Sequence, residues 1–153
     1  MSAYLRLRAV PPSALRNSAT WLERLFEDGA ETVPRCRDQE RIYAGAPSRP
    51  PVRSRPRGQA VLGGLPVFRA DRRKAPLLVL TAAQARQVAG FLAAADFEAL
   101  WDAARDDLLP RYGGAVAELE TWGAFAAAHQ ELRAFYAQTA DCGEAVVKWM
   151  SEG

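Results

Sequence analysis

Hydrophobic and polar residues follow one another over residues 76–108 in a pattern that predicts a strand and two helices. Residues 77–80 are four consecutive apolar residues, enough for a buried strand and too few for a helix. Thr81 and Gln84 follow with the spacing of a capping box, in which each side chain bonds the other residue's backbone N–H at the start of a helix. Apolar residues then recur every three or four positions, and Asp96 is placed to begin a second helix. We expect this unit to form the centre of the fold.

Both ends of the chain carry strand patterns. Residues 4–10 alternate apolar residues with polar ones, as in a strand with one buried face. Residues 144–151 form a short segment with a β-branched pair, which favours a final strand, with one more helical turn as the alternative. A strand there could pair with the N-terminal one and hold both ends of the chain in one sheet.

Turn and capping signals separate these elements. Ser18 is expected to cap a short helix whose apolar face begins at Trp21. The pair Gly63-Gly64 predicts a turn with positive φ or a close approach to another segment, because glycine has no Cβ. A second short strand is expected at residues 65–68.

A long helix is expected over about residues 115–140. Its apolar stripe is spaced by three and four and consists of Leu119, Trp122, Phe125, Ala126, His129, Leu132 and Tyr136. Together the elements predict an α+β fold, with a single domain over residues 1–153. We expect a small mixed or antiparallel sheet packed by about four to five helices.

Residues 30–58 are expected to be an irregular loop rich in proline and arginine, since proline removes backbone donors and fixes φ. The wider segment 35–74 has eleven basic residues against three acidic ones. The loop is either mobile or without a specific role, or it binds a partner. The candidate partner-binding residues are Arg49, Arg53, Arg55 and Arg57. The partner would be a protein, and the excess of arginine would suit an acidic one. Nucleic acid is not expected, because Tyr43 is the only aromatic residue of the loop available for base stacking.

Composition narrows the class of protein further. The chain has 153 residues, 49% of them hydrophobic, which suits one domain with a real core. No apolar run approaches the roughly 20 residues that cross a bilayer, and residues 1–10 lack the apolar stretch of a secretory signal. Cys36 and Cys142 are too few for a disulfide scaffold and are not spaced as a metal site. We therefore expect a cytoplasmic protein with reduced thiols, no metal and no cofactor.

Candidate chemistry centres on His129, the only histidine. It is either a core residue that hydrogen-bonds a neighbour, or a general base or ligand contact at the mouth of a pocket. The tryptophans, which lie on or next to predicted apolar faces, either pack in the core or line such a pocket. The candidate ligand-binding set is His129, Trp122, Tyr136, Trp21 and Trp101. No set of nucleophile and base is evident, so no catalytic residue is assigned.

The order of motifs resembles that of the YfbM-like family of small bacterial proteins of unknown function. The shared features are YLRLRAV, Trp21-Leu22, Gly63-Gly64, LLVLTAAQARQVAGFL, and Leu132-Arg133-Ala134-Phe135-Tyr136 before CGEAVVKWMS. The resemblance covers most of the chain except residues 30–58. Family members often carry a histidine soon after the tryptophan–leucine pair, where this chain has Arg24, Leu25 and Phe26. The resemblance implies an α+β domain and brings no established reaction with it.

Two functions from different classes follow. The first is a non-catalytic binding or interaction protein, such as an accessory, inhibitor or immunity-like partner. It is favoured by the uneven charge, the arginine-rich loop and the lack of a nucleophile–base set. The second is a small-molecule-binding protein or enzyme whose pocket surrounds His129 and is lined by tryptophans.

Overall fold

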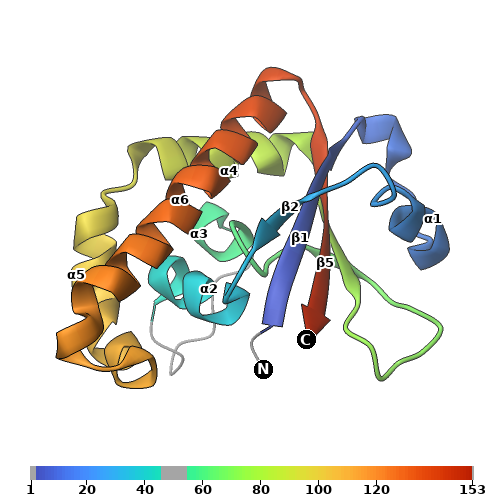
Figure 1. The fold of residues 1–153 in the computed structure, drawn as a ribbon. Coiled ribbons are helices and arrows are strands. Elements are labelled where there is room, and N and C mark those ends of the chain that lie inside the picture. Colours follow the sequence, from blue (N-terminus) through green and yellow to red (C-terminus); the bar gives the residue numbers. More distant parts are fainter. Residues whose placement is uncertain (1–2, 46–54, 153) are drawn as a thin grey trace.

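The protein is built on a five-stranded antiparallel sheet (Figure 1). The computed structural model describes residues 3–45 and 55–152. Across the sheet the strands follow the order β2-β1-β5-β4-β3. Their bounds are β1 Ala3–Val10, β2 Glu31–Val33, β3 Leu65–Val67, β4 Leu77–Leu80 and β5 Ala145–Glu152. The predicted single-domain α+β fold is confirmed, and the pairing of the sheet is antiparallel.

The first and last strands form the centre of the sheet. They pair along their whole length, from Ala3 opposite Glu152 to Val10 opposite Ala145. Both ends of the chain therefore lie side by side (Figure 1). The prediction that the last segment is a strand paired with the first is confirmed.

Six α-helices are described, and they lie on both sides of the sheet. Their bounds are α1 Ala19–Arg24, α2 Cys36–Ala44, α3 Pro56–Gln59, α4 Ala82–Ala94, α5 Phe97–Leu108 and α6 Glu118–Asp141. Short 3-10 turns occupy Pro12–Ala14, Leu109–Tyr112 and Ala115–Ala117. Figure 1 shows α1 on one side of the sheet and the other five helices on the opposite side. The sheet thus has one thickly covered face and one face covered only in part.

Local capping places the helix starts where the sequence predicts them. The Thr81 hydroxyl accepts from the backbone N–H of Gln84, and the Gln84 side chain accepts from the backbone N–H of Thr81. Asp96 caps α5, and Ser18 caps α1 by accepting from the backbone of Trp21. Each cap satisfies a backbone N–H that has no partner within the helix.

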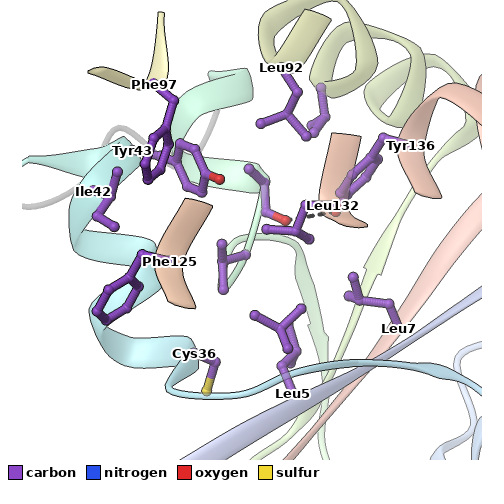
Figure 2. Close-up of a cluster of buried hydrophobic side chains, with 14 of the residues drawn as sticks. Leu5, Leu7, Cys36, Ile42, Tyr43, Leu92, Phe97, Phe125, Leu132 and Tyr136 are labelled. Carbon is purple, nitrogen blue, oxygen red and sulfur yellow. Dashed lines mark hydrogen bonds between the residues drawn. The ribbon is translucent and has the colours of Figure 1, made fainter. Parts of the chain in front are cut away.

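Each face of the sheet has its own hydrophobic core. The main core lies between the sheet and helices α2 to α6, and Figure 2 shows its side chains. The second core lies under α1 and consists of Val10, Leu22, Phe26, Val67, Leu77, Val79, Ala145 and Val147. Because side chains alternate along a strand, β1 directs Leu5 and Leu7 to the main core and Arg6 to the α1 side.

The expectation that residues 30–58 are irregular is wrong for the described part of this segment, since it contains β2 and α2 and the start of α3, while residues 46–54 lie outside the described residues. Helix α2 buries Cys36, Gln39, Ile42 and Tyr43, which follow one another at helical spacing. Asp38 ties this helix to the segment after α5, through Arg111 at 2.7 Å and the Tyr112 hydroxyl. Proline does not interrupt α2, because no proline falls inside it, and Pro56 stands in the first turn of α3, where proline is tolerated.

Candidate functional site

His129 lies inside the main core, on α6. Its side chain is only 2% exposed, and its Nδ1 lies 2.7 Å from the hydroxyl of Tyr43 on α2. Its ring also packs on Phe97 of α5, with the two ring centroids 4.9 Å apart. The histidine therefore joins three helices, as a hydrogen-bonded core residue does.

A short chain of polar side chains on α2 leads to this histidine. Gln39 donates from Nε2 to the Tyr43 hydroxyl at 3.2 Å and to the carbonyl of Phe125 at 3.4 Å. The Tyr43 hydroxyl therefore bridges Gln39 and Nδ1 of His129, and the tautomer of the imidazole decides which group donates in the second bond.

Burial acts on both partners in the same sense, against charge. It lowers the pKa of His129, and the nearby positive charge of Arg133 lowers it further. Burial also raises the pKa of the Tyr43 hydroxyl, although the hydrogen bond from Gln39 opposes this. Near neutral pH the pair is therefore uncharged and suited to packing.

Acid should weaken the fold through His129. A histidine whose folded-state pKa lies below its ordinary value of 6.5 contributes stability that is present above that pH. This stability is lost as the pH falls through the folded pKa. We expect the urea midpoint to drop between about pH 7 and about pH 5, and to drop less in His129→Gln. An equal drop in both proteins would contradict the assignment of the effect to this histidine.

The other predicted ligand residues are held by hydrogen bonds of their own. Tyr136 is fully buried and donates to the carbonyl of Ala60 at 2.9 Å. The indole N–H groups donate from Trp101 to Glu118, from Trp122 to Glu98 and from Trp21 to the carbonyl of Ala14. Trp21 packs against the second core, whereas His129 lies on the opposite side of the sheet. The rings that contact His129 are those of Tyr43 and Phe97.

The predicted partner-binding arginines fall into two groups. Arg49 and Arg53 lie outside the described residues. Arg57 donates from Nε to the carbonyl of Tyr43 at 3.0 Å, which links α3 to the end of α2. Arg55 is exposed at the start of α3. Both residues of the described pair are exposed to solvent, and the Arg57 side chain is in addition tied to the end of α2.

A groove of about 810 Å³ lies between α6 and the end of β1. Its acidic residues include Glu31, Glu131 and Glu144. The one arginine that lines it, Arg8, is engaged by the backbone carbonyls of Asp28 and Gly29 at 3.3 and 3.2 Å. The groove therefore presents negative charge that is open to solvent.

A smaller hollow of about 470 Å³ lies beside α1, on the thinly covered face of the sheet, and we call it the α1 hollow. It is lined by Arg6, Thr20, Glu23, Arg24, Phe26, Glu27 and Trp149. The guanidinium of Arg6 lies over the ring of Trp149 at 4.2 Å and that of Phe26 at 5.3 Å. Arg69 lies over the same indole at 4.7 Å. Arginine stacked on tryptophan is common at sites of recognition.

Arg6 and Lys148 were not identified from the sequence. The alternation along β1 placed Arg6 on a polar face, but only the register of β1 with β5 brings it opposite Trp149. Lys148 is fully buried, and its ammonium donates to the carbonyls of Gln59, Val61 and Gly63. Burial lowers the pKa of Lys148 to about 7, and the charge of Glu40 opposes this. The residues around Lys148 in the sequence do not indicate that its side chain is buried or that its pKa is lowered.

Comparison with known proteins bears on the fold. No family model matches the chain, and no curated protein matches it. Among solved structures, YfbM from Escherichia coli, described as a protein of unknown function, superposes with a TM-score of 0.69 at 15% sequence identity. The match covers 99% of this chain and 100% of YfbM. This chain has the YfbM fold. The predicted resemblance is thereby confirmed for the fold, and nearly the whole chain takes part in it.

Because YfbM is described as a protein of unknown function, the match shows the fold of this chain and no activity. Within the described residues, no group of three or more histidine, cysteine, aspartate or glutamate side chains is placed to hold a metal ion. In the same ranges, no helix combines the length and apolar character needed to span a membrane. Both cysteines are free, as expected, with Cys36 buried and Cys142 exposed.

Proposed function

We propose that this protein is a non-catalytic interaction protein that binds a partner protein through the thinly covered face of its sheet. The observation that carries the proposal is the engagement of the only histidine. His129 is buried, bonded to Tyr43 and stacked on Phe97, so its ring is not presented to a substrate. The side chains that would bind a partner lie on the surface of the sheet instead.

The binding surface, which we call the sheet patch, consists of Tyr4, Arg6, Leu65 and Trp149. Residues that pair across an antiparallel sheet point to the same side, and Arg6 is paired with Trp149. Leu65 pairs with Val79 of the second core and so belongs to this side too. Tyr4 is 37% exposed and Leu65 is 67% exposed. Tyrosine, tryptophan and arginine are the residue types that contribute most to protein interfaces.

A charge placed at Leu65 tests the proposal. We expect affinity capture from cell extract, followed by mass spectrometry, to recover the same partner with the wild type and with Leu119→Asp. The partner should be lost with Leu65→Asp. The control is matched because Leu119, at the start of α6, is also an exposed leucine, at 81%. Surface substitutions of this kind change stability by roughly 0.5 kcal/mol or less, which thermal melting will check.

Two outcomes would contradict the proposal. One is capture of the same proteins by all three baits, or of none by the wild type. The other is a small metabolite that raises the melting temperature of the wild type but leaves His129→Gln, still folded, unchanged. That result would favour the alternative of a ligand pocket at the histidine.

A further inference from the structure

We propose that Arg6 is the anchor of this interface, and that it binds the carboxylate of an aspartate or glutamate side chain of the partner protein. The inference rests on the proposed function and adds the chemistry of the partner. It is carried by the geometry of the α1 hollow, where the guanidinium of Arg6 is held in place but has no partner.

Two aromatic rings hold the Arg6 side chain. Its guanidinium lies 4.2 Å from the centroid of Trp149 and 5.3 Å from that of Phe26. The two rings meet edge to face, with centroids 5.4 Å apart and planes at 84°. A guanidinium stacked in this way loses conformational freedom before a ligand arrives, and its terminal Nη donors remain available.

These donors are unmatched within the described residues. No hydrogen bond or ion pair joins the Arg6 guanidinium to any residue in 3–45 or 55–152, and its Nε is buried without a partner. A buried N–H without an acceptor is costly, because water cannot reach it. A bound acceptor would instead meet the two terminal Nη groups of Arg6, which are not among the buried atoms.

The neighbouring arginine indicates which acceptor suits the site. Arg69 also lies over the indole of Trp149. It donates from Nε to Oε1 of Glu23 at 2.9 Å. The hollow thus already contains one indole-stacked arginine paired with a carboxylate. Glu23 is engaged by that pair, and Glu27, which also lines the hollow, makes no ion pair with Arg6 among the described residues. The place opposite Arg6 is therefore open to a carboxylate of the partner.

The hollow is open enough to admit a side chain of a partner protein. It has a volume of about 470 Å³ and lies on the same side of the sheet as the exposed Leu65. Arg24 and Glu27, which are both exposed, line its rim with opposite charges. A carboxylate matches the fork of N–H donors that arginine presents, and the apolar residues of the sheet patch would contact the residues around it.

The test follows the Nε–H signal of Arg6 by NMR of the wild-type protein. The probe is the peptide acetyl-Leu-Glu-Leu-amide, and the matched control is acetyl-Leu-Gln-Leu-amide. We expect a saturable shift with the glutamate peptide and none with the glutamine peptide. The variant Arg6→Lys, which lacks the signal, assigns it. Arg24→Gln, on the rim of the same hollow, should give the wild-type titration.

The outcomes separate this inference from the proposed function. An unmoved Arg6 signal, or an equal shift with the glutamine peptide, overturns the carboxylate anchor and leaves the result of the Leu65→Asp capture standing. Saturation at a lower concentration of inorganic phosphate than of the glutamate peptide overturns it in favour of a phosphate ligand. With a partner in hand, Arg6→Gln should weaken binding about tenfold or more, and an unchanged affinity would overturn the inference.

Discussion

Replacing Lys148 by methionine is expected to lower the free energy of unfolding by roughly 3–5 kcal/mol. The ammonium group lies in the main core and donates to the carbonyls of Gln59, Val61 and Gly63, the last two at 2.8 Å. Methionine fills a similar volume but donates nothing. Three carbonyl groups of one turn would then be left without this donor, and each unsatisfied buried group costs about 1–3 kcal/mol.

Urea denaturation measures this effect, and the chain provides its own control. Lys74 is the only other lysine, and its side chain is exposed in the β3–β4 connection. Lys74→Met should change the free energy of unfolding by no more than about 0.5 kcal/mol. Hydrogen exchange should also show that the amides near residues 59–63 lose protection in Lys148→Met. A loss below about 1 kcal/mol would mean that the turn is held by other contacts.

Gly63→Ala should be the second most damaging change, with a loss of roughly 3 kcal/mol or more. A Cβ at this position would lie 1.9 Å from the carbonyl oxygen of Gly58 and 2.8 Å from the Cα of Gln59. Both atoms belong to the backbone, so the clash cannot be relieved by turning a side chain. The turn would have to open, and the Gly63 carbonyl would move away from Lys148.

An alanine elsewhere in the chain gives the opposite sign and serves as the control. Gly90 lies within α4, and a Cβ there meets nothing within 4 Å. Gly90→Ala should therefore raise the free energy of unfolding by roughly 0.5–1 kcal/mol, because alanine restricts the unfolded chain more than glycine does. Thermal or urea unfolding of both variants tests the pair. Similar stabilities for the two would refute the close approach at Gly63.

The double glycine shows what a sequence pattern can and cannot resolve. The pattern predicted either positive φ or close approach, and the two residues divide these roles. Gly64 has φ +150, whereas Gly63 has no such backbone angle and is the residue pressed against Gly58. Which residue takes which role depends on where the chain at residue 58 lies, and no nearby sequence encodes that.

The same distinction applies to the candidate site. The sequence identified His129 as buried or pocket-lining, because its position in an apolar stripe is a local property. It did not identify Tyr43 as the hydrogen-bond partner, which comes from a segment 86 residues away that was expected to be irregular. It gave no reason to single out Arg6, since pairing with Trp149 depends on register between the two ends of the chain.

By itself, the sequence determined the elements whose signals are local: the alternating strand at residues 4–10, the capped helices at Thr81 and Asp96, and the long helix that carries His129. Helix capping and hydrophobic periodicity involve residues only a few positions apart, so a short stretch of sequence is enough to recognise them. Only the tertiary structure decided that α2 forms, that Lys148 is enclosed by three carbonyls and that Arg6 lies unpaired between two rings. These features depend on contacts between residues far apart in the chain, and such contacts exist only once the sheet has brought its strands together.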